Sequence, residues 1–266
     1  MKRVLVTGSR GMLGSVLMKK LAAGGTGMDL PELDVTSQES VDAAVQAVRP
    51  EVIINAAAIT DVDRCEKEPD LCRAVHCSGV RNLCSTGVRV ITISTDQVFT
   101  DGRGAFLTES SSVEPANKYA ESKLTGEKEA LGRAGNCVVR TSWLFEDRGL
   151  LPRIIRILSK GGQVKAIADQ TSSVTSASDL AEFLLSLVSN ENSTGVYHCV
   201  NPGAATPFTL ACEIMEQLGR GIVIPVRWKD LELPASRPVW SVLGTEKNVV
   251  LPPLEEAVKS CMQKLL

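Results

Sequence analysis

The chain has 266 residues, of which 44% are apolar and 23% charged, with a formal net charge of -2 at pH 7. This composition predicts a globular protein with a sizeable core, and it excludes a nucleic-acid-binding face and a polybasic membrane segment. The first residues, MKRVLVTG, contain a short apolar stretch that ends at a glycine. This stretch is too short for a signal peptide or a membrane span. We therefore expect a cytoplasmic protein.

The N-terminal region predicts a strand, a turn and a helix. Residues 3–8 (RVLVTG) form a short apolar run typical of a buried strand. Residues 11–25 follow with the spacing of an amphipathic helix that two glycines end. The apolar side chains expected on one face of this helix are Leu13, Val16, Leu17 and Leu21.

The turn between this strand and this helix carries three glycines, Gly8, Gly11 and Gly14. Their spacing lets the backbone approach a pyrophosphate at the positive end of the helix, so the turn predicts a dinucleotide site. Asp29 stands at the distance along the chain where a carboxylate binds a free ribose hydroxyl, whereas Arg10 within the turn would bind a ribose phosphate. The sequence favours NADPH and leaves NADH open.

Strands and helices continue to alternate along the first half of the chain. Residues 36–50 read as a helix with a capping box between Thr36 and Glu39, while TGMDL at residues 26–30 is too short and polar to decide a strand. Further strands are expected at 51–58, 88–95 and 136–143, and further helices at about 69–85 and 117–131. Parallel strands joined by helices predict a doubly wound α/β sheet.

The last third of the chain gives mixed signals, without a linker or a repeat. Helices are expected near residues 151–162, 177–188, 209–219 and 252–266, and strands near 164–168 and 195–200. We expect residues 1–142, with contributions from about 164–200, to form a dinucleotide-binding domain. Residues 143–266 are then expected to form mainly a smaller substrate-binding lobe that is interleaved with the sheet.

Polar side chains at the end of one strand and the start of the next helix indicate a reacting centre. The strand delivers Ser94, Thr95 and Asp96 to its carboxyl end, where open α/β sheets bind ligands. Tyr119 and Lys123 are four residues apart and share one face of the helix. A phenol and an ammonium on one helix face could act together at a single reacting atom. The hydroxyl groups at the strand end could form hydrogen bonds with a substrate carbonyl oxygen.

Several segments together resemble the dTDP-4-dehydrorhamnose reductase family of the extended short-chain dehydrogenase/reductases. They are RPEVIINAAAITDVDRCEKEP, STDQVFTDG, EPANKYAESKLTGE, VVRTSWLF and PASRPVWSVLGTEK, and the resemblance spans nearly the whole chain. It implies a Rossmann-type doubly wound sheet with a smaller, interleaved C-terminal lobe that binds a nucleotide sugar. It also implies NADPH-dependent reduction of the C4 ketone of a nucleotide-linked 4-keto-6-deoxy sugar, in first place dTDP-4-dehydro-L-rhamnose to dTDP-L-rhamnose.

The resemblance also implies roles for individual residues. Tyr119 would donate the proton with the help of Thr95, and Lys123 would hold the nicotinamide ribose and lower the pKa of the phenol. The other residues implied to contact the cofactor are Gly8, Gly11, Met12 and Leu13 on the pyrophosphate turn, Asp34 and Val35 beside the adenine, and Ala57, Ala58 and Thr60 beneath the cofactor. Those implied to contact the substrate are Thr95, Asp96, Trp143 and, toward the nucleotide, Arg237.

Some positions around the substrate depart from the family pattern, among them Gln97 in place of an aromatic residue and Val242 in place of an arginine. A different 4-keto-6-deoxy sugar nucleotide therefore stays open. Two other functions also stay open: an NADP-binding regulatory subunit of the methionine adenosyltransferase beta type, and a sugar-nucleotide epimerase or dehydratase. Because Thr95, Tyr119 and Lys123 are present together, the sequence favours the reductase.

The eight cysteines include no Cys-x-x-Cys pair and no accompanying histidine pair, so we expect small buried apolar side chains and no zinc site. His76 and His198, the two histidines, fall on a helix and a strand, where a core or surface role is expected. Some relatives pair through a magnesium-bridged helical interface, but no carboxylate cluster in the sequence requires one. We therefore expect no metal and leave a homodimer open.

Overall fold

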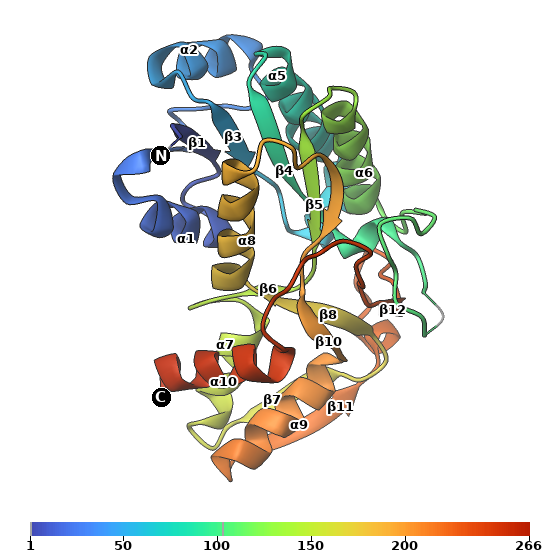
Figure 1. Ribbon diagram of the computed structural model, residues 1–266. Coiled ribbons are helices and arrows are strands. Elements are labelled where there is room, and N and C mark those ends of the chain that lie inside the picture. Colours follow the sequence, from blue (N-terminus) through green and yellow to red (C-terminus); the bar gives the residue numbers. More distant parts are fainter. Residues whose placement is uncertain (1, 103) are drawn as a thin grey trace.

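The computed structural model describes residues 2–102 and 104–266. A sheet flanked by helices forms the larger part, and a lobe that contains the C-terminus adjoins it below (Figure 1). None of the helices within these described residues is long and apolar enough to cross a membrane.

The central sheet contains six parallel strands in the order β2-β1-β3-β4-β5-β9. They are β1 (Val4–Thr7), β2 (Gly25–Met28), β3 (Val52–Asn55), β4 (Arg89–Thr95), β5 (Cys137–Thr141) and β9 (Gly195–His198). The expected Rossmann-type doubly wound sheet is thereby confirmed. The short segment after the first helix, which the sequence left undecided, forms β2 and pairs along β1.

Helices cover both faces of this sheet because successive strand residues point to opposite sides. They are α1 (Met12–Leu21), α2 (Gln38–Val48), α5 (Gly79–Ser85), α6 (Lys118–Leu131) and α8 (Ala177–Ser189). Val4 and Val6 pack in one core cluster with residues of α1 and α8, whereas Leu5 packs in another with residues of α2 and α5. Burial on both sides explains why these strands read as continuous apolar runs.

The structure confirms the predicted apolar face of α1 but not the predicted start of α2. The apolar face expected on α1 is confirmed, since its four predicted residues are buried. The capping box at Thr36 is wrong by one residue: Ser37 is the N-cap of α2, and its hydroxyl accepts a hydrogen bond from the Ser40 amide. Thr36 instead donates its hydroxyl hydrogen bond to Asp34, 2.7 Å away.

A chain of short helices crosses from β3 to β4. It consists of α3 (Val62–Lys67), α4 (Pro69–Arg73), the π-helical turn η2 (Ala74–Ser78) and α5. The last three run on without a break and so confirm the helix expected at residues 69–85. Short 3-10 turns follow α1 as η1 (Ala22–Gly24) and β4 as η3 (Asp96–Val98).

The smaller lobe is built from two small sheets and helices packed on them. One sheet has the order β10-β8-β12, with β6 also paired to β8, and the other pairs β11 with β7. The strands are β6 (Leu144–Phe145), β7 (Gln163–Ile167), β8 (Thr171–Ser176), β10 (Asn201–Ala205), β11 (Ile222–Val226) and β12 (Trp240–Ser241). The helices are α7 (Leu150–Leu158), α9 (Pro207–Leu218), η4 (Trp228–Leu231) and α10 (Leu254–Leu265).

The segment at residues 164–200 is shared between the two parts. α8 packs on α1 and β9 extends the large sheet beside β5, whereas β7 and β8 belong to the small sheets. We propose that residues 1–142 with α8 and β9 form the dinucleotide-binding domain. The remainder of residues 143–266 would then form mainly the substrate-binding lobe.

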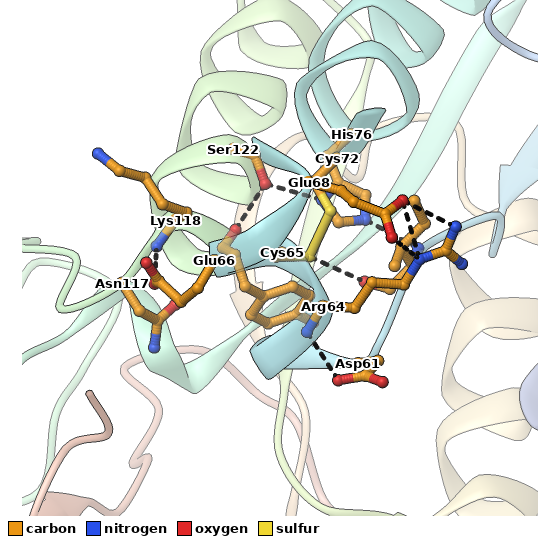
Figure 2. Close-up of a disulfide and its surroundings, with 12 residues drawn as sticks. Asp61, Arg64, Cys65, Glu66, Glu68, Cys72, His76, Asn117, Lys118 and Ser122 are labelled. Atoms are coloured by element: carbon orange, nitrogen blue, oxygen red, sulfur yellow. Dashed lines mark hydrogen bonds and ion pairs between the residues drawn. A yellow bond between two sulfur atoms is a disulfide. The ribbon is translucent and has the colours of Figure 1, made fainter. Parts of the chain in front are cut away.

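The expectation that the cysteines are all separate apolar side chains is wrong for Cys65 and Cys72, which form a disulfide (Figure 2). In one continuous helix, residues seven apart would be about 10 Å apart. The backbone leaves the helical conformation at Glu68, between α3 and α4, and this bend brings the two Cα atoms within 5.7 Å. Among the described residues, no group of three or more His, Cys, Asp or Glu side chains could hold a metal ion.

Candidate active site

The glycine turn after β1 packs its backbone closely against neighbouring segments. Gly8 has a φ of +65°, and a Cβ at this position would lie 2.7 Å from the backbone of Ala56. A Cβ on Gly14 would lie 2.2 Å from the carbonyl oxygen of Gly8. The N-terminus of α1 follows this turn without a side-chain cap, so its amide groups are left for another partner. The turn therefore fits a dinucleotide pyrophosphate.

A cavity of about 390 Å³ lies between this turn and the carboxyl ends of β3, β4 and β5. It brings together most of the residues that the sequence predicts for cofactor binding and catalysis. These are Gly11, Met12, Leu13, Ala57, Ala58, Thr60, Thr95, Asp96, Tyr119, Lys123 and Trp143. The predicted residues outside its lining are Gly8, Arg10, Asp34, Val35 and Arg237.

Tyr119 lies in the first turn of α6, which begins after Asn117. The Asn117 side chain accepts a hydrogen bond from the Ala120 amide at 2.8 Å and so fixes where the helix starts. Burial raises the pKa of Tyr119 to about 12, a hydrogen bond with Thr95 opposes this rise, and the charge of Asp96 adds to it. The expectation of a lowered phenol pKa is therefore wrong, because desolvation of the phenolate dominates.

Lys123 lies one turn further along α6, with its side chain directed toward β4. Its Nζ donates a hydrogen bond to the carbonyl oxygen of Ile93 at 2.6 Å. Burial lowers the pKa of Lys123 to about 8, while the carboxylate of Glu127, one further turn along the helix, acts against this. Lys123 is therefore mostly protonated at neutral pH and loses its proton as the pH rises through about 8.

Asp96 lies at the bottom of the cavity in a cluster of hydroxyl groups. Its Oδ2 accepts hydrogen bonds from Ser241 at 2.5 Å and Ser172 at 2.9 Å, and its Oδ1 accepts one from Thr95 at 3.1 Å. Burial raises the pKa of Asp96, and these hydroxyl groups oppose the rise. Because the serines come from β8 and β12, Asp96 joins the large sheet to the smaller lobe.

A second cavity, also of about 390 Å³, lies on the lobe side of Asp96. Both cavities are lined by Asp96, Gln97, Trp143 and Leu144, so these residues mark where the two cavities meet. Trp143 has a φ of +25°, which is a strained conformation for a residue with a side chain. Backbone strain of this kind persists only where the surroundings hold it, and it is common in functional sites.

Arg237 lines this second cavity and joins the lobe to α3. Its guanidinium donates hydrogen bonds to both oxygens of Asp63, at 2.9 and 3.0 Å, and lies 4.4 Å from the centre of the Trp228 ring. The hydrogen bond from Arg237 is the main reason that the pKa of Asp63 is lowered. Sequence reasoning missed both neighbours of this arginine, because Asp63 is 174 residues away along the chain and Trp228 lies in η4, outside the motif that carries Arg237.

Arg10 lies at the outer edge of the glycine turn, beside the segment that follows β2. Its backbone amide donates to Asp29 at 3.1 Å, and its guanidinium donates to Glu32 at 2.6 Å and to the carbonyl oxygen of Leu30 at 2.7 Å. Arg10 and Asp29, the two residues suggested by the sequence for ribose binding, therefore lie next to each other. Glu32 is a further carboxylate at this place that the sequence reasoning missed.

Asp34 and Val35 lie further along the same segment, just before α2. Asp34 accepts hydrogen bonds from both the amide and the hydroxyl of Thr36, at 2.9 and 2.7 Å. Val35 is buried in the core cluster below β1 and accepts a hydrogen bond from Asn82 on its carbonyl oxygen. Their proposed place beside an adenine stays a prediction.

Comparison with known proteins agrees with this geometry. The family model described as "RmlD substrate binding domain" matches residues 1–266. A dTDP-4-dehydrorhamnose reductase of Streptomyces griseus is 35% identical over 263 residues, which cover 92% of this chain and 86% of that protein. The chain belongs to the dTDP-4-dehydrorhamnose reductase family. The expected class of NAD(P)H-dependent oxidoreductase is thereby confirmed.

Two further members of this wider group extend the comparison. The crystal structure of a dTDP-4-dehydrorhamnose reductase from Bacillus anthracis in complex with NADP is 30% identical, covers 99% of each chain and superimposes with a TM-score of 0.92. A Streptomyces antibioticus protein named as a probable dTDP-4,6-dihydroxy-2-methyloxan-3-one 4-ketoreductase is 31% identical over 92% of this chain and 88% of its own length. Relatives of similar identity therefore carry names with different sugars.

Proposed function

We propose that this chain reduces the C4 ketone of a nucleotide-linked 4-keto-6-deoxy sugar with NADPH, and that the substrate is dTDP-4-dehydro-L-rhamnose. The observation that carries the proposal is the single cavity in which Thr95, Tyr119 and Lys123 lie next to the glycine turn. Reduction of a ketone needs these groups together: a cofactor cradle, a proton donor and a donor for the developing oxyanion.

The side chains divide the reaction between them. When bound, NADPH supplies the hydride to the ketone carbon. Tyr119 gives its proton to the ketone oxygen, and because burial raises the pKa of this phenol to about 12, it holds the proton throughout the working range. The Thr95 hydroxyl, which donates to Asp96 in this structure, would turn to donate its hydrogen bond to the same oxygen. Lys123 holds the ribose, and its charge offsets the phenolate left by proton transfer.

The two cavities suit the two ends of a nucleotide sugar. The sugar would occupy the first cavity, beside Tyr119 and Asp96, and the nucleotide would extend past Trp143 into the second. Trp228 lines the second cavity and would offer an aromatic surface for a base, and Arg237, which is paired with Asp63, would offer hydrogen-bond donors for a phosphate. This division supports a substrate in which an anionic nucleotide with an aromatic base is attached to the sugar.

Cofactor choice is expected to depend on competition for Arg10. Glu32 now occupies the guanidinium, so a ribose 2′-phosphate has to displace a carboxylate that is itself largely exposed. Glu32→Gln should therefore raise the affinity for NADP⁺ about fivefold and leave that for NAD⁺ unchanged, while Arg10→Met should lower the affinity for NADP⁺ about tenfold. Isothermal titration with each dinucleotide measures both effects.

Arg81→Met is the matched control, because Arg81 is an exposed arginine that pairs with Glu129 at 2.7 Å. This variant should bind both dinucleotides as the wild type does. A clear preference of the wild type for NAD⁺, or an Arg10→Met variant with undiminished affinity for NADP⁺, would remove the role proposed for Arg10.

The proposed activity is tested by following NADPH absorbance while two sugars are offered separately, dTDP-4-dehydro-L-rhamnose and a second 4-keto-6-deoxy sugar nucleotide. Stoichiometric oxidation with the first supports the proposal, and oxidation with the second alone keeps the reductase but changes the sugar. Conversion of either sugar without oxidation would identify an epimerase or dehydratase. Binding of NADP⁺ with no conversion would favour a regulatory subunit.

A further inference from the structure

His76 is a buried histidine that the chemistry described above does not use. It lies in the π-helical turn η2 with 1% of its surface exposed. Its Nε2 lies 2.9 Å from the amide nitrogen of Ile59, and its Nδ1 lies 2.8 Å from the hydroxyl of Ser122. Figure 2 shows His76 next to Cys72, with a dashed line to Ser122 on α6.

The hydrogen-bond partners fix the tautomer of this ring. A backbone amide can only donate, so Nε2 of His76 accepts from Ile59 and carries no proton. Nδ1 then carries the proton and donates it to Ser122, whose own hydroxyl donates to the carbonyl oxygen of Tyr119 at 2.7 Å. Burial lowers the pKa of His76 to about 3, and the charge of Lys123 acts in the same direction. The ring therefore stays neutral at working pH.

This chain of hydrogen bonds joins two segments that line the same cavity. Ile59 stands between Ala58 and Thr60, which border the cavity on the side of β3. Tyr119 borders it on the side of α6, and the ring of His76 meets the phenol edge-on, with 5.6 Å between the ring centres.

Close packing leaves little freedom between these segments. A Cβ on Gly126 of α6 would lie 2.0 Å from the carbonyl oxygen of His76, so the helix lies directly against η2. With the backbones this close, the imidazole ring spans a fixed distance from Ile59 to Ser122. Displacement of either end would break a hydrogen bond to the buried His76 side chain.

We propose that His76 is a positioning residue that sets the distance between Tyr119 and the loop at residues 57–60. This inference rests on the proposed function, in which the loop lies beneath the cofactor and Tyr119 delivers the proton. His76 touches neither substrate nor cofactor and acts through Ser122 and Ile59. His76 would thereby keep the proton donor within hydrogen-bond distance of the ketone oxygen during hydride transfer.

The experiment compares His76→Leu and Ser122→Ala with His198→Leu as the matched control. His198 is equally buried and is hydrogen-bonded to the carbonyl oxygens of Leu107 and Gly244, and none of these three residues lines the cavity. Each variant is titrated with NADP⁺ to count binding-competent sites. Its kcat per site is then measured with dTDP-4-dehydro-L-rhamnose and with NADPH that is either unlabelled or deuterated at the transferred position.

Misplacement by about 1 Å lowers a rate about 100-fold, so we expect kcat per site to fall by about that factor in His76→Leu and by less in Ser122→Ala. The KM for NADPH should change little, and the deuterium isotope effect on kcat should equal or exceed that of the wild type. His198→Leu should reduce the number of competent sites while each remaining site keeps its kcat.

Unchanged kcat per site in both His76→Leu and Ser122→Ala would overturn the inference and leave His76 as a core residue. If His76→Leu does not fold, Ser122→Ala decides between the two outcomes, because it removes the hydroxyl that joins His76 to the Tyr119 carbonyl and leaves the imidazole in place. A wild-type protein that binds NADP⁺ but oxidises no NADPH would contradict the proposed function instead. The two failures are therefore distinguishable.

Discussion

Tyr119→Phe is expected to abolish turnover of the sugar while leaving NADP⁺ binding largely intact. The substitution removes the phenol oxygen and keeps the ring that packs against His76. General acid catalysis of this kind contributes between about a hundredfold and ten-thousandfold, so the loss should exceed about a hundredfold. NADPH oxidation and NADP⁺ titration, measured on the same preparation, check both halves of the prediction.

Tyr197→Phe provides the matched control. Tyr197 lies on β9, where its ring packs against Phe183 and beneath the ammonium of Lys247, away from the cavity lining. This variant should keep wild-type turnover. Retention of more than a few per cent of the activity in Tyr119→Phe would contradict the role of that phenol as the proton donor.

Lys123→Met is expected to lower turnover about a hundredfold or more, and to abolish one feature of the pH profile. In the proposed mechanism the ammonium form is the active one, and burial lowers the pKa of Lys123 to about 8. Turnover should therefore be level below about pH 8 and fall about tenfold per pH unit above it, because the cation loses its proton there. Tyr119 does not contribute in this range, because burial raises its pKa to about 12.

The variant should show a low rate without this fall, since it has no ammonium to lose. Lys118→Met is the control on the same helix: Lys118 is half exposed and pairs with Glu121. It should keep both the rate and the fall above pH 8. An identical alkaline fall in Lys123→Met would show that another group titrates there and would remove the role of Lys123 in the profile.

The sequence pattern was sufficient to predict the central sheet and most of the residues that line the first cavity. Strands such as β1 and β3 are buried on both faces, so they are continuous apolar runs that stand out beside amphipathic helices. The glycine turn and the Tyr119–Lys123 pair are local motifs, because each lies within a few consecutive residues of the sequence. Local motifs of this kind can be found without knowledge of how distant segments meet.

Contacts between distant segments could not be predicted in this way. Asp96, Ser172 and Ser241 are more than sixty residues apart from one another, and only the fold places their oxygen atoms within hydrogen-bond distance. The strands β8 and β12 that carry these serines are short and polar, so their residues resemble a loop in the sequence. The same is true of the pair between Asp63 and Arg237.

The direction of the Tyr119 pKa shows a second reason why sequence reasoning fell short. A lysine four residues away on a helix lowers the pKa of a phenol only if the charge outweighs the loss of water around it. Sequence spacing places the two groups on one face, but it does not tell how deeply the face is buried. The phenol is buried here, and its raised pKa keeps it protonated across the working range.

Reduction at C4 is tested most directly by following the hydride itself. The purified protein is incubated with dTDP-4-dehydro-L-rhamnose and NADPH that carries deuterium at the transferred position, and the product is analysed by NMR. We predict one NADP⁺ formed for each sugar reduced and deuterium on C4 of dTDP-L-rhamnose. Conversion of the sugar without NADPH oxidation, or a reduced sugar without deuterium at C4, would contradict the proposed function.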